Sequence, residues 1–326
     1  MSKLRLAIPN GHLNDATLSI LSSAGYRISG EKRTYRPAIN DHHIDLRMLR
    51  PQEIPIFVSE GIQDVGITGY DWMCECGVDV ELLVDLEYSP VRIVVAVPNE
   101  MNSVNSLGDL IELFAQRGKQ LRVFTEYLTL AKRALLNDPV YKKYYGSSEP
   151  MVITPWWRTG SNSQVGVYLS FGATEAKPPT AADAIVEVVD TGTSLEQNGL
   201  KPVATLLKST AVLIANRQAM EDPVKREKIA DIMTLLRGVV EGRKKLHVFI
   251  NVQRDRLEEL LSQLPALQSP TVSQLSDPNW VAVNTVVDRT EFLSLIPKLR
   301  RLAQGLVVFE PRQVLPLVTD GGRDSQ

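Results

Sequence analysis

The stretch ADAIVEVVDTGTSL, residues 182–195, has the pattern of a buried strand, a tight turn and the start of a helix. Nearly continuous aliphatic residues over 183–189 predict a strand that is covered on both faces. The Thr-Gly-Thr-Ser sequence at 191–194 then predicts a turn that opens a helix. A strand followed by a turn and a helix is the repeating unit of α/β proteins, so this stretch predicts that class of fold.

The same turn has the composition of a phosphate site. Backbone N–H groups at a helix start carry partial positive charge, and Gly192 would let phosphate oxygens approach the backbone closely. Hydroxyl donors are supplied by Thr191, Thr193 and Ser194. Glu187 and Asp190, just before the turn, can accept hydrogen bonds from a ribose diol or help to hold Mg²⁺. A phosphoribosyl group suits this combination, and an ordinary helix cap is the alternative.

An α/β alternation begins at the first residues of the chain. Pro51 is expected to open a helix and Gly61 to close it, because a missing N–H is tolerated at the first helical position and glycine suits the position after the last. The expected strands and helices cover 4–9, 13–24, 44–49, 51–60, 64–68, 80–86 and 91–98. We assign residues 1–97, together with 204–243, to a first lobe.

A second α/β alternation follows residue 98. It predicts a helix at 106–116, a strand at 121–125 and a helix at 128–136, and it resumes with the strand at 183–189. The intervening aromatic, Gly and Ser residues predict an inserted, partly ordered segment near 138–170. The second lobe is therefore expected to comprise residues 98–203.

A long amphipathic helix at 223–241 marks the next boundary. Beyond it, the order strand, helix, strand, strand, helix, strand predicts a ferredoxin-like α+β domain over residues 244–318. Modules of this kind often bind small regulatory molecules, although the fold alone does not establish a function. The polar residues 319–326 are expected to form a disordered tail.

The composition excludes several classes of protein. Of 326 residues, 36 are Lys or Arg and 38 are Asp or Glu, so no global field favours nucleic acid or an acidic membrane. No apolar run at the N-terminus is long enough for a signal peptide or a membrane span. Cys74 and Cys76 are too close for an ordinary structural disulfide, so we expect reduced, partly buried thiols in a cytoplasmic protein.

Six segments, in the same order along the chain, resemble the long-form ATP phosphoribosyltransferases. The phosphate stretch ADAIVEVVDTGTSLEQNGL resembles that family's phosphoribosyl-pyrophosphate loop nearly position for position. The other segments are LRLAIPNGHL, LRPQEIPIFVSEGIQDVGITGYDWM, RVFTEYLTLAKRAL, SFGATEA and LQSPTVSQLSDPNWVAVNTVV. The resemblance covers most of the chain apart from residues 138–168 and the tail.

The resemblance implies a fold and a reaction. The fold is a pair of periplasmic-binding-protein-like α/β lobes (type II), with the active site between them, and a C-terminal ferredoxin-like (ACT-like) regulatory domain. The reaction is the first step of histidine biosynthesis, in which ATP and phosphoribosyl pyrophosphate give phosphoribosyl-ATP and pyrophosphate. The family also implies Mg²⁺ as cofactor, feedback inhibition by histidine, and dimers that assemble into hexamers.

The family's functional residues carry over by motif position. The phosphoribosyl-pyrophosphate ligands would be Glu187, Asp190, Thr191, Gly192, Thr193 and Ser194, with Mg²⁺ held through the substrate phosphates and by Glu187 and Asp190. The catalytic candidates are Arg50, Lys132, Arg133 and Glu175. Candidates for contact with ATP are Asn10, His12 and Asp71, and candidates for contact with histidine are Asn251, Ser269 and Thr271.

Three positions depart from the family pattern. The family's opening turn carries Lys and Arg where this chain has Asn10 and His12, and Arg often follows GITG where this chain has Tyr70. Fewer cations at a site for two polyphosphates place more of the binding on Mg²⁺ or on other arginines. The arginines that could take this role are Arg33, Arg36 and Arg158. Two alternatives therefore stay open: a non-catalytic ligand-binding or regulatory paralogue, and phosphoribosyl transfer to a different base.

Overall fold

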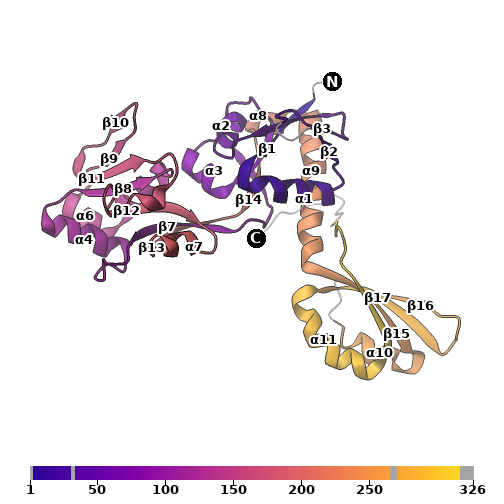
Figure 1. Ribbon diagram of the computed structural model, residues 1–326. Coiled ribbons are helices and arrows are strands. Elements are labelled where there is room, and N and C mark those ends of the chain that lie inside the picture. The colour runs from indigo at the N-terminus through magenta and orange to yellow at the C-terminus, as the bar shows by residue number, and fades with distance from the viewer. Residues whose placement is uncertain (1–2, 31–33, 265–269, 316–326) are drawn as a thin grey trace. The chain divides into compact units, whose positions relative to one another are not determined.

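The computed structural model describes residues 3–30, 34–264 and 270–315. The chain divides into two compact units, one comprising residues 5–16 and 46–219 and the other comprising residues 1–4, 17–45 and 220–326 (Figure 1). Arg33, Ser269 and the expected tail at 319–326 lie outside the described residues. None of the helices within the described ranges is both long enough and apolar enough to cross a membrane.

The first α/β sheet has five strands. Their order is β4 (Ile44–Leu49), β1 (Leu4–Pro9), β5 (Val65–Gly69), β14 (Ala211–Ala215) and β6 (Glu81–Asp85). β1 and β5 are parallel, and β14 runs antiparallel to β5 and β6. Every residue of β5 is buried. A Cβ on Gly66 would lie 2.4 Å from the side chain of Ile54, so helix α2 (Ile54–Ser59) packs directly on this strand.

The second α/β sheet has seven strands. Their order is β10 (Arg158–Thr159), β9 (Pro150–Ile153), β11 (Asn162–Leu169), β8 (Leu121–Thr125), β12 (Ala184–Val189), β7 (Val91–Pro98) and β13 (Leu200–Ser209). β9, β11, β8 and β12 run parallel to one another. β7 and β13 are antiparallel to their neighbours. Helices α4 (Leu107–Arg117), α5 (Leu128–Asn137) and α6 (Pro139–Tyr145) accompany this sheet.

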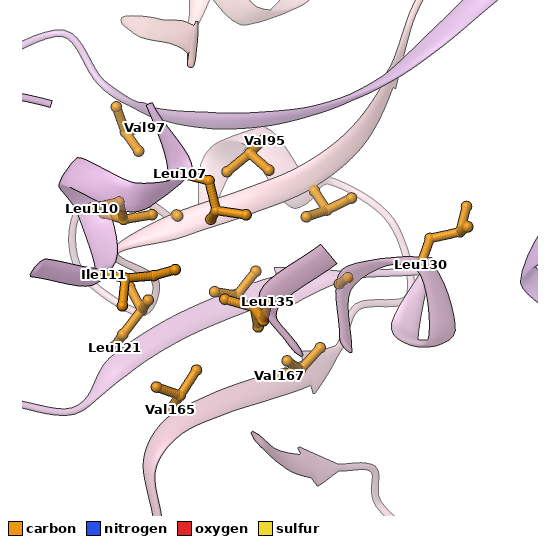
Figure 2. Close-up of a cluster of buried hydrophobic side chains, with 14 of the residues drawn as sticks. Val95, Val97, Leu107, Leu110, Ile111, Leu121, Leu130, Leu135, Val165 and Val167 are labelled. Carbon is orange, nitrogen blue, oxygen red and sulfur yellow. The ribbon is translucent and has the colours of Figure 1, made fainter. Parts of the chain in front are cut away.

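The core of the second sheet follows from the aliphatic strand pattern. Figure 2 shows Leu110 of α4 and Leu135 of α5 with Val95 and Val167 of the sheet, and all four side chains are buried. Helix α4 begins at Ser106, whose hydroxyl accepts a hydrogen bond from the Asp109 N–H at 3.0 Å, and ends at Gly118 in the left-handed conformation. Both ends therefore have the residue types that helix termini favour.

Two sequence expectations about the second lobe differ from the structure. Strands β7 and β13 pair with each other in the second sheet, whereas we had assigned residues 91–97 and 204–209 to the first lobe. The segment 138–170 is regular rather than partly ordered, because it forms α6, β9, β10 and the inner strand β11. Alternating small and polar residues in NSQVGVYL concealed that strand, although its neighbours bury Val165 and Val167 completely.

The other unit contains α9 (Pro223–Lys244) and a four-stranded antiparallel sheet. The sheet order is β16 (Thr271–Gln274), β17 (Trp280–Asp288), β15 (Lys245–Gln253) and β18 (Ala303–Phe309), with helices α10 (Leu257–Leu261) and α11 (Arg289–Leu302) in the connections. This connectivity confirms the ferredoxin-like domain. Burial alternates along β17, so one face of the sheet packs on the helices and the other is more open. The remaining helices and strands are α1 (Asn14–Ser23), α3 (Tyr70–Cys76), α7 (Thr193–Gln197), α8 (Arg217–Glu221), β2 (Ile28–Ser29) and β3 (Ala38–Ile39).

Candidate active site

Four loops meet at one edge of the second sheet. Because β9, β11, β8 and β12 are parallel neighbours, their carboxyl ends lie at the same edge (Figure 1). In open α/β sheets, ligands bind outside the carboxyl ends of the strands. The segments that follow these strands are residues 154–157, 170–175, 126–127 and 190–194. The phosphate turn and the Glu175 segment, which the sequence analysis placed in one site, therefore share this edge.

The phosphate turn is open and has the backbone that its glycine permits. Gly192 has φ 94° and ψ −6°, a conformation that side-chain-bearing residues rarely adopt. Among the described residues, the one atom within 4 Å of a Cβ built on Gly192 is a methyl carbon of Val189 at 3.9 Å, so a Cβ would meet little resistance there. The hydroxyls of Thr191 and Thr193 lie 3.0 Å apart on the exposed side of the turn. The turn thus presents several donors to one small volume.

Glu175 is tied to the phosphate turn. Its Oε1 accepts a hydrogen bond from the Ser194 hydroxyl at 2.5 Å. The loop that carries Glu175 is held from below, because the Lys177 ammonium donates to the Ser170 hydroxyl at 2.7 Å and to the Gly172 carbonyl at 2.8 Å. Glu175 therefore has a defined position beside the turn. Lys177 was missed in the sequence analysis, because a lysine two residues after a motif carries no distinctive signal.

The acids before the turn differ in environment. Burial raises the pKa of the Glu187 carboxyl above its ordinary value, while the Val188 N–H and the Thr174 hydroxyl oppose the rise and nearby Glu175 adds to it. The Val188 N–H donates to Glu187 Oε1 at 2.9 Å. Asp190 is exposed at the end of β12. The strand therefore ends with one half-buried acceptor and one open acceptor on the approach to the turn.

Asp71 is not an open ligand. Its side chain is 4% exposed, Oδ1 accepts from the Ser209 hydroxyl at 2.6 Å, and Oδ2 accepts from the Tyr127 hydroxyl at 2.8 Å. Both carboxylate oxygens are thus engaged by groups of the second lobe. Burial and the neighbouring Asp71 charge raise the pKa of the Tyr127 phenol, which keeps it a donor. The expected contact of Asp71 with ATP is therefore replaced by a joint between the two lobes.

Glu75 extends this joint. Its two carboxylate oxygens accept from the N–H groups of Thr129 at 2.8 Å and Leu130 at 2.9 Å, which satisfies donors left free at the start of α5. Trp72 stacks on Tyr127 with ring centroids 4.6 Å apart and belongs to the buried core of the second sheet. Sequence reasoning missed Glu75, although Asp71 and Glu75 are four residues apart and so share one face of helix α3.

The cationic candidates are distributed around α5 and the first lobe. The Lys132 ammonium lies 2.7 Å from a carboxylate oxygen of Glu149. Arg133 is exposed, and its guanidinium opposes the rise in pKa that burial causes at Glu75. Arg50 is exposed directly after β4. Within the described residues, none of these three side chains forms a hydrogen bond or an ion pair with the phosphate turn.

The two opening-turn candidates lie after β1. The Asn10 N–H donates to the Leu49 carbonyl at 2.8 Å, and His12 is exposed in the short 3₁₀ turn Gly11–Leu13. Cys74 and Cys76 are free cysteines of intermediate burial, so the expected partial burial of both side chains is confirmed. Burial raises the pKa of Cys76 to about 11, so this thiol is protonated at neutral pH.

The described residues contain no group of three His, Cys, Asp or Glu side chains that could hold a metal ion. The acids near the turn include Glu187 and Asp190 at the end of β12 and Glu175, which accepts the hydrogen bond from Ser194. Mg²⁺ typically keeps several waters and binds through one or two carboxylates together with substrate phosphates. One or two carboxylates at the end of β12 are therefore a donor set that fits Mg²⁺ bound together with a pyrophosphate.

The histidine candidates lie on the ferredoxin-like domain. Asn251 pairs with Ala282 and Thr271 pairs with Asn284, so both side chains are on the more open face of the sheet, separated by β17. His247 and Asn284 form a hydrogen bond on this face. The structure brings Asn251 and Thr271 to one surface but not into contact.

Comparison with known proteins decides the family. The sequence profile of the ATP phosphoribosyltransferase family matches residues 50–238, and the profile of that family's C-terminal domain matches residues 242–312. The chain belongs to the ATP phosphoribosyltransferase family. It is 36% identical over 320 residues to the ATP phosphoribosyltransferase of Pelotomaculum thermopropionicum, which covers 96% of this chain and 100% of the relative. It is 38% identical over 318 residues to the ATP phosphoribosyltransferase of Chlorobium chlorochromatii. The aligned region covers 96% of this chain and 97% of that relative.

Solved structures agree with this family. The ATP phosphoribosyl transferase (HisG:HisZ) complex from Thermotoga maritima contains a chain with a TM-score of 0.55 and 21% identity, covering 73% of this chain and 98% of that chain. The two-lobed catalytic fold and the C-terminal domain expected from the sequence are thereby confirmed, as are transferase activity and the place in histidine biosynthesis. The comparisons give no support to the non-catalytic alternative or to transfer onto a different base.

Proposed function

We propose that the loops after β11, β8 and β12 form the site at which N1 of the adenine of ATP attacks C1 of phosphoribosyl pyrophosphate. The new bond joins N1 to C1, and the bond between C1 and the pyrophosphate oxygen breaks with its electron pair on the leaving group. The products are phosphoribosyl-ATP and pyrophosphate. The transfer activity itself is that of the family to which the chain belongs.

The observation that carries this placement is the turn Thr191–Ser194 at the end of β12. Gly192 leaves its space open, and three hydroxyl side chains surround it. In the proposal, these groups and the backbone N–H groups hold the 5′-phosphate, while Glu187 and Asp190 accept hydrogen bonds from the ribose hydroxyls. A ligand with a phosphate at one end and a diol at the other satisfies both sets of groups.

The chemistry needs position and charge more than a strong base. The barrier lies in separating charge at C1, where the ribose gains oxocarbenium character as pyrophosphate gains negative charge. Holding two substrates in line contributes about 7 kcal/mol or more in favourable cases. Fixed donors and cations stabilise the leaving group without reorganising during the reaction. In this account Lys132, Arg133 and Arg50 serve the pyrophosphate or the ATP phosphates, and Glu175 positions Ser194.

Mg²⁺ is proposed to enter with phosphoribosyl pyrophosphate. When bound, it would neutralise charge on the pyrophosphate as that group leaves. Glu187 and Asp190 are the protein groups that would contribute to its coordination. These two acids are also the proposed acceptors for the ribose diol.

The reduced number of basic residues is proposed to be compensated locally. Asn10, His12 and Tyr70 stand where the family has cations, so ATP would depend more on Mg²⁺ and on other arginines. Arg158 is exposed and is proposed to serve in this way. Asn10 and His12 remain proposed contacts of ATP through hydrogen bonds rather than charge.

Regulation is proposed to act through the ferredoxin-like domain. Histidine would bind on its open face near Asn251 and Thr271 and shift the catalytic unit toward a less active arrangement. Assembly into dimers and hexamers, and a cytoplasmic location, are proposed on the same family grounds.

One assay tests the proposed function. Purified protein is mixed with ATP, phosphoribosyl pyrophosphate and Mg²⁺, and both pyrophosphate release and the ribosylated adenine adduct are followed. We expect both products in equal amounts, and less of both when histidine is added. Failure to form the adduct with ATP, at protein concentrations where the fold is intact, would contradict the proposal.

A further inference from the structure

Two exposed aromatic rings touch at the edge that carries the phosphate turn. Trp156 follows β9 and is 72% exposed, and Phe171 follows β11 and is 70% exposed. Their ring centroids lie 5.8 Å apart and their planes are at 81°. In this edge-to-face arrangement each ring keeps at least one face open to solvent, so a flat aromatic ligand can still stack on either of them.

Both rings stand on loops that are pinned by hydrogen bonds. The buried Thr154 hydroxyl oxygen accepts from the N–H groups of Trp156 at 3.3 Å and Trp157 at 3.0 Å. Phe171 lies between Ser170 and Gly172, which the Lys177 ammonium holds from below. Large apolar side chains that a rigid scaffold presents to water are typical of binding surfaces, because their exposure is otherwise unfavourable.

The loops that carry the two rings lie at the same sheet edge as the proposed substrate site. The loop that begins with Phe171 ends at Glu175, which accepts the hydrogen bond from Ser194 of the phosphate turn. Neighbouring strands are separated by about 4.8 Å, so the loop after β9 lies about 14 Å, or three strand spacings, from the turn after β12. A nucleotide ring that reacts at the sugar held by this turn would therefore reach the rings along the same edge.

We infer that Trp156 and Phe171 form a stacking platform for the purine ring of the nucleotide substrate. The inference rests on the proposed function, because it assumes that the sugar phosphate occupies the turn after β12. Stacking is tolerant of orientation but requires a planar ring, so the platform selects a nucleobase rather than a sugar or a phosphate. Arg158, exposed two residues after Trp156, is placed to meet the phosphates of the same nucleotide.

A second copy of the chain is the competing occupant of these rings. A stable protein interface buries about 1,200–2,000 Å² in total, whereas one aromatic side chain buries about 150–250 Å². Two rings on narrow loops therefore suit a ligand of the size of a purine better than a partner subunit. The test below separates these two occupants.

The test uses the full chain and the variants Trp156→Leu and Phe171→Leu, with Tyr35→Leu as matched control. Tyr35 is also exposed, at 67%, but lies in the other compact unit. Each Leu variant at the platform is expected to raise the KM for ATP about 5- to 150-fold, the range that corresponds to loss of one stacked base. The KM for phosphoribosyl pyrophosphate and the elution volume in gel filtration are expected to stay unchanged, and Trp156→Phe is expected to restore the KM for ATP.

Tryptophan fluorescence gives a second readout that does not depend on turnover. ATP is expected to quench the wild-type emission, and the quenching is expected to diminish in Trp156→Leu and to persist in Tyr35→Leu. An unchanged KM for ATP in both platform variants, or a shift in oligomeric state at constant KM, overturns the inference. If the wild-type protein forms no adduct, the proposed function fails, and the ATP titration still decides whether Trp156 contacts the nucleotide.

Discussion

The two α/β lobes contain the same kind of arginine–aspartate contact between neighbouring parallel strands. In the first lobe the Arg5 guanidinium and backbone N–H both donate to Asp64, with NH2 at 2.6 Å from Oδ1. In the second lobe Arg122 binds Asp183 in the same way, with NH2 at 2.9 Å. In each lobe the arginine stands on one parallel strand and the aspartate directly precedes the next. The two lobes therefore share one plan for joining neighbouring strands.

The lobes differ at the other end of those strands. Seven residues after Asp64, Asp71 is buried and binds Tyr127 and Ser209 of the second lobe. Seven residues after Asp183, Asp190 is exposed and opens the phosphate turn. The corresponding aspartate thus forms a contact between the lobes in one case and is an exposed acid in the other. The difference teaches that an acid at a strand end indicates a binding site only when its oxygens are free.

The largest expected effect distinguishes Gly192 from Gly77, two glycines with a left-handed backbone conformation. Gly192→Val places a branched side chain in the open space of the phosphate turn, so we expect turnover to fall about 100- to 1,000-fold. Gly77→Val is the matched control, because Gly77 has φ 60° and no atom within 4 Å of its Cβ. Both variants are expected to lose about 1–2 kcal/mol of stability from the strained backbone. Steady-state kinetics and thermal unfolding measure the two effects, and equal turnover in both variants would remove the special role of the turn.

The next effect compares the two aspartates. Asp71→Ala removes the acceptor of the buried Tyr127 hydroxyl and the closer of the two acceptors of the Ser209 hydroxyl, so we expect a loss of about 2–3 kcal/mol in the free energy of unfolding. Asp190→Ala removes an exposed carboxylate and is expected to change stability by about 0.5 kcal/mol or less, while it raises the KM for phosphoribosyl pyrophosphate. Urea denaturation and kinetics distinguish the pair. The comparison breaks if Asp190→Ala proves the less stable variant.

A pH profile compares two half-buried glutamates. Burial raises the pKa of both Glu187 and Glu75 above the ordinary value of 4.5. Only ionised Glu187 accepts hydrogen bonds from the ribose with both oxygens, so kcat/KM for phosphoribosyl pyrophosphate is expected to fall as the pH drops through this raised pKa. The Glu187→Gln variant is expected to lose this acidic limb at about tenfold lower activity, and Glu75→Gln is expected to keep it. A limb that survives in Glu187→Gln assigns the titration to another group.

The smallest effect tests the shared plan. Arg5→Lys and Arg122→Lys each lose the bidentate contact with aspartate but keep the positive charge. The side chain of Arg5 is 39% exposed and that of Arg122 is 34% exposed. We therefore expect each change to cost about 1 kcal/mol or less, and the two costs to be similar. Thermal unfolding of the two variants side by side measures them. A several-fold difference between the two costs would show that the lobes do not use the pair alike.

Local patterns in the sequence were sufficient for much of the fold. Continuous aliphatic residues in β12, the glycine and hydroxyl residues after it, and the helix and strand order from β15 to β18 all lie within short windows. The pairing of β7 with β13 joins residues about a hundred positions apart and has no local signature, so the lobe boundary was misplaced. The strand β11 was missed because small and polar residues interrupt its hydrophobic pattern.

The candidate site could be predicted only in part for the same reason. Ser194 and Glu175 belong to recognisable motifs, and the structure joins the two residues by a hydrogen bond. Asp71 lies in a recognisable motif, but its carboxylate oxygens are engaged by Tyr127 and Ser209. These partners are 56 and 138 residues away, so the sequence motif gave no sign of them. The platform residue Trp156 lies in a turn whose aromatic residues gave no indication that a second ring, from the end of β11, would meet it.

The most direct test of the account is a crystal structure of the protein with phosphoribosyl pyrophosphate and Mg²⁺ bound. The account predicts that oxygens of the 5′-phosphate lie about 2.7–3.2 Å from hydroxyl and N–H donors of the turn Thr191–Ser194, with the ribose hydroxyls against Glu187 and Asp190. An occupied ligand whose 5′-phosphate binds elsewhere, with this turn filled only by water, would contradict it.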